Sequence, residues 1–344
     1  MKKIFKTVAY LALALAAVGC AKAEKEGPND ANERYFNAWM SLNYPDAKPV
    51  GIGIYVLEEE VGDGAVIDKD RYVYARYTAT DLEGNITSYT DEETAKQLGE
   101  YKPADYYGPK VLTTFESTIQ AGLREAIVGM RIRGRKKVII PGWLMTYNSY
   151  DTPEEYLENS STGSDAIYDI TITDVTPDIN KYEIQEMAQY FSDNYETFGV
   201  FSSADSLKGH YGCYYKQIKA PVDTTSFSND TTIYINYTGK LLNGQVFDTT
   251  IEKVAKDNNI YSATRSYEPV SIKWAEKYED LTMGSSATSV ISGFGITLWQ
   301  MRAFEKGVGV FYSPLGYSYS GSGSTIPPYS PLVFEIEIVA EPED

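Results

Sequence analysis

The residues whose types and spacing point most clearly to a site lie in the stretch SVISGFGITLWQM, residues 289–301. An apolar strand end, Val290-Ile291, runs through Gly293 into a short amphipathic helix. Phe294, Leu298 and Met301 follow a spacing of four and then three residues, which puts them on one helix face. We expect a sheet built around this helix, with a small apolar cavity at the helix start.

Side chains able to carry covalent or metal chemistry are scarce. The single histidine, His210, lies beside glycine at the start of a predicted strand, which favours a structural role. No nucleophile-elbow motif is present, and one histidine gives little basis for a catalytic triad or a zinc site. The glycine-rich segment 321–325 precedes Ile-Pro-Pro rather than a helix, so it predicts a flexible loop and not a phosphate site. We expect no metal and no cofactor.

The helix unit occurs twice. Ile119-Gln-Ala-Gly-Leu123, followed by Ile127 and Met130, repeats the later stretch at identical spacing. The copies are offset by 160 residues at Tyr77 and Tyr237 but by 171 at Met130 and Met301, so the second copy carries about 11 extra residues. This insertion lies within 251–288 and predicts a lid-like flap.

The second copy resembles an FKBP-type peptidyl-prolyl cis-trans isomerase over about residues 209–340. The pieces that carry the resemblance follow one another in the order of the family: Tyr237-Thr-Gly, Leu242-Asn-Gly, Val246-Phe-Asp248, Val290-Ile-Ser-Gly-Phe294 with Leu298 and Met301, Leu315-Gly-Tyr317, Ile326-Pro-Pro328 and Leu332-Val-Phe-Glu-Ile-Glu337. Each piece alone is weak, and together they are specific. The whole chain resembles exported two-domain lipoproteins of this family from Gram-negative bacteria.

The resemblance implies a shallow apolar pocket for a proline ring. Phe294 would form its floor, and the rim would hold Asp248, Tyr317 and Ile326. The walls would be Tyr237, Phe247, Val290, Ile291 and Phe334. The Tyr317 hydroxyl would hold a peptide carbonyl, and Asp248 would orient the pocket through a hydrogen bond to a tyrosine.

The sequence departs from the family pattern at two positions of the predicted pocket, and two sets of pocket residues have a plain alternative role. Phe294 stands where the family usually has tryptophan, and Val270 stands where it tends to carry an aromatic residue, so the pocket would differ in width or shape. Taken without the resemblance, the phenylalanines Phe247, Phe294 and Phe334 are more typical of a hydrophobic core than of a pocket. Asp248 after a strand could simply cap a turn.

The first copy departs much further from the family pattern. Thr87-Ser88 replaces the Phe-Asp pair, Gln120 replaces the second apolar residue, Leu123 replaces the floor aromatic, and Thr146 replaces the rim tyrosine. The core positions remain. We therefore expect a retained fold without a working pocket.

The expected architecture is α+β, with two tandem FKBP-like domains. Each would be a curved antiparallel sheet that wraps a short helix and follows another helix. The predicted segments are a signal peptide (1–19), a tether (20–31), a degenerate domain (32–176), a linker helix (177–208) and an isomerase domain (209–344).

The amino terminus resembles a bacterial lipoprotein signal. Three lysines precede an apolar run from Val8 to Val18, and Ala17-Val-Gly-Cys20 places small residues before a cysteine. Cys20 would then be acylated, leaving Cys213 alone and no intramolecular disulfide. The formal net charge of −17 disfavours nucleic-acid binding. We expect a lipid anchor in a Gram-negative envelope, in the outer membrane.

Two hypotheses for function follow. The first is a peptidyl-prolyl isomerase that binds proline-containing segments of exported proteins, with activity in the second domain. The second is a non-enzymatic lipoprotein that uses the pocket or the flap to hold a partner peptide. Thirty tyrosines give a glycan-binding surface protein as a third, weaker hypothesis.

Overall fold

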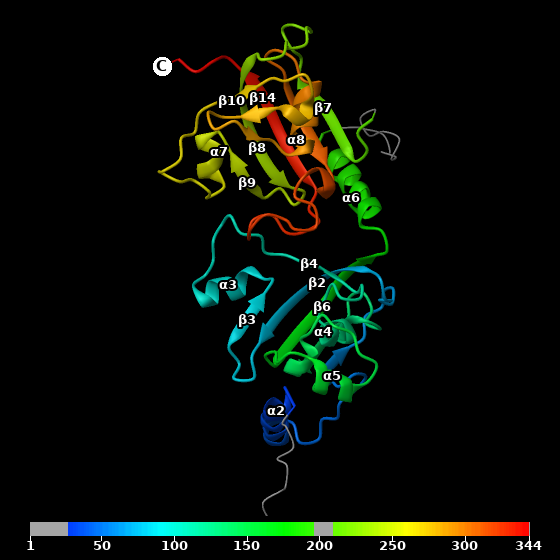
Figure 1. Ribbon diagram of the computed structural model, residues 1–344. Coiled ribbons are helices and arrows are strands. Elements are labelled where there is room, and N and C mark those ends of the chain that lie inside the picture. Colours follow the sequence, from blue (N-terminus) through cyan, green and yellow to red (C-terminus); the bar gives the residue numbers. More distant parts are fainter. Residues whose placement is uncertain (1–26, 196–208, 344) are drawn as a thin grey trace, which may run out of the picture.

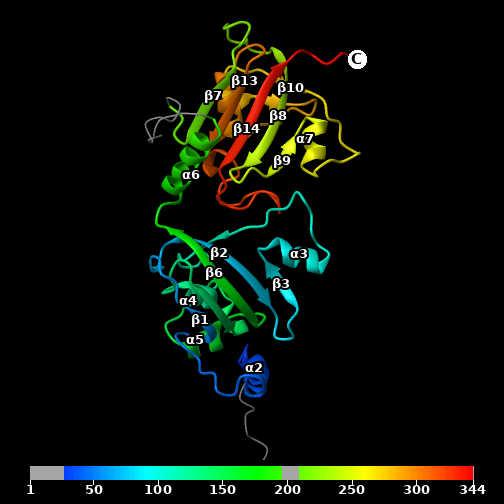
Figure 2. The ribbon, with the colours of Figure 1, turned by 180° about the vertical axis from the view of Figure 1, so that it is seen from behind.

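The computed structural model describes residues 27–195 and 209–343. Within these ranges the chain forms two antiparallel β-sheets, one from each half of the sequence, placed end to end along the molecule (Figures 1 and 2). Each sheet carries a short helix and a hydrophobic core of its own. The predicted α+β class with two tandem domains is therefore confirmed.

The first sheet has the strand order β1-β5-β6-β2-β3, and β4 pairs with β2. Its strands are β1 (Tyr55–Glu60), β2 (Tyr72–Thr80), β3 (Ile86–Tyr89), β4 (Lys110–Thr113), β5 (Arg135–Ile140) and β6 (Ala166–Thr176). On β2, Val73, Ala75 and Ala79 are buried. They are two and four residues apart, and this even spacing puts them on one side of the strand, the side that faces the core.

The second sheet has the order β12-β11-β10-β8-β14-β13-β7, and β9 pairs with β8. Its strands are β7 (Cys213–Lys219), β8 (Thr232–Leu241), β9 (Val246–Thr249), β10 (Val270–Lys273), β11 (Thr282–Met283), β12 (Thr288–Ser289), β13 (Lys306–Phe311) and β14 (Leu332–Val339). The path β7-β13-β14-β8 repeats β1-β5-β6-β2, and β9 and β10 take the places of β3 and β4. The two sheets thus share one connectivity.

The helix at the centre of each domain lies very close to its sheet. These helices are α4 (Ala121–Ile127) and α8 (Ser292–Gln300). A Cβ added at Gly293 would lie 2.2 Å from the Phe311 ring, and one at Gly122 would lie 2.3 Å from Ile140. Each helix therefore needs glycine near its start. On α8 the predicted apolar face is buried.

A longer helix precedes each domain, as expected. These helices are α2 (Asp30–Asn43) and α6 (Ile179–Asn194). Phe36 of α2 lies 5.6 Å from the Tyr55 ring on β1. On α6, Ile184, Met187 and Phe191 pack against Tyr214 of β7 and its neighbours. The segment predicted as a linker therefore packs on the outer face of the second sheet, up to the point where the described residues end at 195.

The segments between these elements are more regular than the sequence suggests. The polar segment 88–110, which the sequence indicates to be irregular, contains α3 (Glu92–Leu98), and the segment between β5 and β6 contains η1 (Gly142–Leu144) and α5 (Pro153–Asn159). The later flap contains α7 (Glu252–Asp257), η2 (Tyr278–Asp280) and the hairpin of β11 and β12; η3 (Ser313–Leu315) follows β13.

The extra residues of the second domain form this hairpin. The first domain needs eight residues to pass from Thr113 at the end of β4 to Ala121, whereas the second needs 19 from Lys273 at the end of β10 to Ser292. The hairpin extends the edge of the sheet through β10, because β11 pairs with both β10 and β12. It is thus part of the sheet and not a separate lid.

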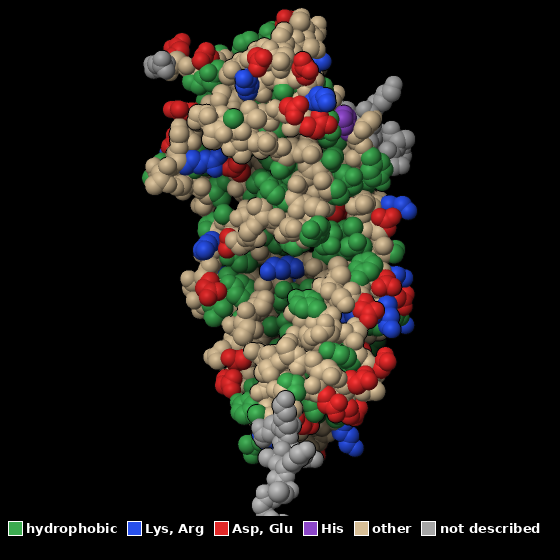
Figure 3. All heavy atoms as spheres, in the orientation of Figure 1, with side chains coloured by type: hydrophobic (Ala, Val, Ile, Leu, Met, Phe, Trp, Pro, Cys, Tyr) green, Lys and Arg blue, Asp and Glu red, His purple; other side chains and the backbone are tan. Residues whose placement is uncertain are grey.

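No helix among residues 27–195 and 209–343 is long and apolar enough to cross a membrane. Acidic side chains are spread over the face shown in Figure 3, whereas apolar side chains gather around its middle, between the two sheets. The predicted signal peptide and Cys20 lie outside the described residues.

Candidate functional site

A cavity of ≈ 530 Å³ opens at the start of α8, on the inner side of the second sheet. All nine residues predicted for the pocket line it. These are Tyr237, Phe247, Asp248, Val290, Ile291, Phe294, Tyr317, Ile326 and Phe334. They come from β8, β9, the start of α8, β14 and the loops after β12 and β13, so segments almost 100 residues apart converge on one space.

The inner wall of this cavity is a set of aromatic rings around Phe334 on β14. The Phe334 ring centre lies 5.0 Å from that of Phe294 and 5.6 Å from that of Phe247, both edge-to-face. Tyr237 lies 5.7 Å from Phe294, also edge-to-face. This geometry is favourable for aromatic pairs because the positive ring edge meets the negative ring face. Phe294 and Phe334 are 3 % and 5 % exposed, so the floor is dry.

A polar network closes one side of the cavity. The Tyr237 hydroxyl donates to Asp248 Oδ2 at 2.6 Å, which is the bond expected between Asp248 and a tyrosine. Arg265 pairs with the other carboxylate oxygen of Asp248. Burial, and then the charge of Asp248, raises the pKa of Tyr237 well above its usual value. The Tyr237 hydroxyl therefore keeps its proton and remains a donor.

Tyr317 stands at the mouth of the cavity and is 36 % exposed. Burial, and then the negative charge of Asp248, raises the pKa of its phenol, so it too stays protonated at neutral pH. Within the described part of the chain, its hydroxyl has no hydrogen-bond partner. It is thus free to donate to a carbonyl group of a bound peptide.

The family of this domain follows from sequence comparison. Residues 223–339 match the model of the FKBP-type peptidyl-prolyl cis-trans isomerase family, and the cavity residues all lie within that range. The second domain belongs to the FKBP family. The match covers the FKBP domain from before β8 to the end of β14.

Relatives of the FKBP domain support this assignment. A probable FKBP-type peptidyl-prolyl cis-trans isomerase of Haemophilus influenzae is 30% identical over 128 residues, which are 37% of this chain and 42% of that protein. The chain thus spans less than half the length of this relative.

Solved structures with some similarity include FkpA from Escherichia coli (18% identity, 51% of this chain and 73% of that one, TM-score 0.29). Another is a peptidyl-prolyl cis-trans isomerase from Pseudomonas syringae (21% identity, 48% and 97%, TM-score 0.31). Because both TM-scores are low, the family assignment rests on the match over residues 223–339.

Several cavity residues of the FKBP domain were not predicted from sequence. Met283, Thr288 and Ser289 come from the inserted hairpin, and residues 322–325 come from the loop before Ile326. The length difference between the two copies was the available signal for the hairpin. Arg265, the partner of Asp248, had no such signal because its loop position depends on how α7 and β10 are placed.

Val270 does not line this cavity. It lies on β10 opposite Ile235, packs against the core, and faces a separate hollow with Pro269 and Ser271. Valine in place of the family's aromatic residue therefore changes the packing of the core beside the pocket, whereas the pocket wall is not affected. Asp248 does more than cap a turn, because it pairs with both Tyr237 and Arg265.

The first domain holds small or polar groups at the corresponding positions. Ser88 stands for Asp248, and Gln120 Nε2 donates to the Tyr147 hydroxyl at 3.3 Å. Thr146 is buried, and its hydroxyl accepts from the backbone N–H of Asn148 at 3.2 Å. Gln120 and Thr146 are thus hydrogen-bonded to neighbouring groups of the first domain.

The single histidine and the remaining cysteine have structural surroundings. His210 meets the Tyr278 ring edge-on, with centres 5.2 Å apart. Cys213 is fully buried, and burial raises the pKa of its thiol to about 12. The thiolate needed for nucleophilic chemistry is therefore strongly disfavoured. Among the described residues, no group of three or more His, Cys, Asp or Glu side chains could hold a metal ion.

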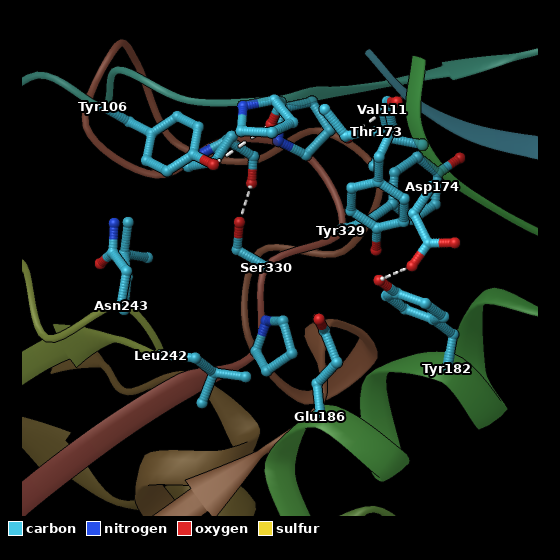
Figure 4. Close-up of a pocket in the computed structure, with 16 residues that line it drawn as sticks. Tyr106, Val111, Thr173, Asp174, Tyr182, Glu186, Leu242, Asn243, Tyr329 and Ser330 are labelled. Atoms are coloured by element: carbon cyan, nitrogen blue, oxygen red, sulfur yellow. Dashed lines mark hydrogen bonds between the residues drawn. The ribbon is translucent and has the colours of Figure 1, made fainter. Parts of the chain in front are cut away.

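A second cavity of ≈ 390 Å³ lies between the two domains. Tyr182 and Glu186 of α6 line it, Tyr106 comes from the first domain, and Tyr329 comes from the loop before β14 (Figure 4). Its wall includes the prolines of segment 327–331, which directly follow Ile326. One loop therefore separates the interdomain cavity from the candidate isomerase pocket.

Proposed function

We propose that this chain is a peptidyl-prolyl cis-trans isomerase that assists the folding of exported proteins, with catalysis in its second domain. The observation that carries the proposal is the arrangement of nine residues around one apolar cavity inside the segment that matches the FKBP family. Proline-containing segments of exported proteins would be its substrates.

The cavity suits this reaction because no bond has to break. Amide resonance gives rotation a barrier of roughly 18–20 kcal/mol. The planar amide is more polar than the twisted one, so removing water from it disfavours the planar form more. The buried rings of Phe294 and Phe334 supply the dry surface. Tyr317 would hold the peptide carbonyl while the bond turns.

The pair of Asp248 and Arg265 would keep the pocket in shape. Asp248 fixes the Tyr237 ring through the hydroxyl bond, and the ring in turn contacts Phe294. The first domain lacks this set, and we propose that it is not catalytic.

A non-enzymatic peptide-binding function is the alternative. Phe294 lacks the N–H of the usual tryptophan, and the inserted hairpin adds Met283 to the cavity wall. Both changes would suit a pocket that holds a peptide without turning its bond.

Cys20 would anchor the mature chain in the outer membrane of a Gram-negative cell. The lipoprotein-like sequence before Cys20 supports this proposal, and the acidic composition favours attachment by lipid over attachment by charge.

The decisive experiment measures isomerisation of a peptide of the Ala-Leu-Pro-Phe type by soluble chain 21–344. We expect acceleration by the parent. Tyr317→Phe should lower kcat/KM by roughly 3- to 10-fold, the effect of one lost hydrogen bond. Asp248→Ala should lower it on the order of tenfold, because a charged partner is lost.

Ser88→Ala in the first domain is the matched control, since Ser88 occupies the place of Asp248, and it should leave kcat/KM unchanged. Peptide binding by a well-folded parent without acceleration would reject the enzyme and support the alternative. Equal loss in the Ser88 variant would show that the assignment to the second domain is wrong.

A further inference from the structure

The wall of the candidate isomerase pocket includes a loop, residues 322–326, that is anchored in its own domain at the buried Ile326. Residues 322–326 line the cavity and contain only an isolated bridge, in which the Ser322 N–H donates to Ile326 O at 2.7 Å. Gly321 and Gly323 both have positive φ. Glycine adopts such conformations easily and also leaves them easily. Between Gly321 and Ile326, the shape of this wall therefore also depends on contacts from outside the loop.

An equivalent arm projects from each domain after α3 and after α7. Tyr101 stacks on Tyr107 in the first arm, and Tyr261 stacks on Tyr267 in the second. In both arms the second tyrosine hydroxyl accepts from a backbone N–H five residues earlier. The arms thus correspond residue by residue at an offset of 160.

This correspondence pairs Asp105 with Arg265. In the second arm, Arg265 binds Asp248 of its own domain. In the first arm, Asp105 has only Ser88 at the position of Asp248, so the pair that closes the pocket is absent. Asp105 instead accepts a hydrogen bond at 2.6 Å from the hydroxyl of Ser324, which belongs to the other domain.

Further contacts fix the first arm to the second domain. The Tyr106 N–H donates to Ser324 O at 2.8 Å. Gln245 Nε2 donates to Ala104 O at 3.0 Å and to Asp105 O at 3.1 Å. The Tyr106 side chain packs against the core of the second domain. Ser324 is therefore held on both its carbonyl and its hydroxyl.

Below these contacts the domains are separated by the cavity shown in Figure 4. Across the neighbouring hollow, Tyr72 of β2 meets the Tyr329 ring with centres 5.3 Å apart. The first domain thus contacts this loop of the second domain on both sides of Ile326, at Ser324 and at Tyr329. Segment 327–331 itself borders the open cavity. The arm at 104–106 adds hydrogen bonds from the first domain to those that the loop makes within its own domain.

We propose that the first domain is a positioning element for the pocket of the second: Asp105 and Tyr106 hold Ser324, and thereby keep residues 322–326 in the shape that binds peptide. This inference rests on the proposed isomerase function. A loop that leaves this shape lowers the fraction of binding-competent molecules, and apparent affinity falls by that fraction. The Phe294 floor and Tyr317 are unaffected, so turnover of bound peptide is preserved.

The test compares Asp105→Ala, Ser324→Ala and the double variant in soluble chain 21–344. Each single change should raise KM by roughly fivefold, the factor expected from one hydrogen bond, with kcat unchanged. The double variant should match the singles, because all three remove the same bond. Asp105→Asn keeps an acceptor oxygen and should restore most of the affinity. Lys102→Ala, on the same arm, is the control.

Hydrogen exchange gives a readout that does not need activity. The amides of Ser322 and Ile326 should exchange faster in Asp105→Ala and Ser324→Ala but not in Lys102→Ala. Unchanged exchange and unchanged KM would overturn the proposal, as would a fall in kcat at constant KM. If the parent protein shows no isomerisation, the proposed function fails, whereas exchange still decides whether the first domain holds the loop.

Discussion

Glycine stands at position 239 on β8, where the first domain has Ala79. A Cβ at 239 would lie 2.6 Å from the Phe247 ring and 3.0 Å from the Phe334 ring. These two rings can reach the pocket wall only because no side chain is there. In the first domain Thr87 replaces Phe247 and donates to Ala79 O at 3.2 Å, so the alanine is accommodated. An aromatic residue at position 247 therefore requires glycine at position 239.

We expect Gly239→Ala to destabilise the protein by about 1–3 kcal/mol, because the added methyl group has to displace two packed rings. Isomerase activity should fall with it. Thermal unfolding and the peptide assay measure the two effects. The matched change, Ala79→Gly, should cost only about 0.5–1 kcal/mol, from added backbone freedom, and should leave activity intact. Equal stability of parent and Gly239→Ala would contradict this account.

Among the secondary-structure elements, α6 makes the least obvious contact. It carries Glu183, whose side chain is fully buried. The Glu183 carboxylate accepts from the N–H of Ser313 at 2.6 Å and from its hydroxyl at 2.7 Å. Burial outweighs these two bonds and raises the pKa of Glu183 to about 7. We therefore expect the packing of α6 on the second domain to depend on pH.

The sign of this effect follows from proton binding. Between pH 4.5 and about 7 the folded protein binds more protons at Glu183 than the unfolded chain, so stability falls as pH rises through this range. The contribution is about 3 kcal/mol at most. Glu183→Gln should remove it. Denaturant unfolding at pH 5 and pH 8 measures the difference.

Glu158→Gln on α5, an exposed position, is the control for this experiment and should keep the pH dependence of the parent. A Glu183→Gln protein with the full dependence of the parent would show that other groups cause it.

The whole molecule contains one strand connectivity twice. The second domain has the apolar pocket, whereas the first contributes an arm that hydrogen-bonds to the pocket loop. Carboxylates are spread over the surface in Figure 3, and the net charge is −17. Such a surface does not bind anionic membranes by charge, so the proposed membrane attachment depends on the lipid.

Cys20→Ser should abolish incorporation of labelled fatty acid in a Gram-negative host, because the proposed anchor uses the Cys20 thiol as the acceptor. The parent chain should stay with the membrane after washing in high salt, since apolar insertion is not screened by ions. The control is Cys213→Ala, which removes the other cysteine and should leave labelling unchanged. Labelling that survives in Cys20→Ser would disprove the anchor.

Much of the fold and the pocket lining could be predicted from the sequence. The spacing of Phe294, Leu298 and Met301 depends on the helix repeat alone, and the strand around Tyr237 shows the two-residue period of a sheet. Both are local properties of the chain. The nine pocket residues were predicted through the order of their short motifs, and they surround one cavity. Their catalytic roles stay predictions.

The sequence by itself determined the duplicated sheet, the central helices and nine of the residues that surround the pocket, because periodicity and motif order are properties of the chain alone. Only the tertiary structure decided that Arg265 meets Asp248, that the inserted residues form a hairpin, and that Asp105 reaches Ser324. These contacts join loops whose ends are set by separate strands. The partner of a loop residue depends on where both loops are held, and no spacing along the chain encodes that.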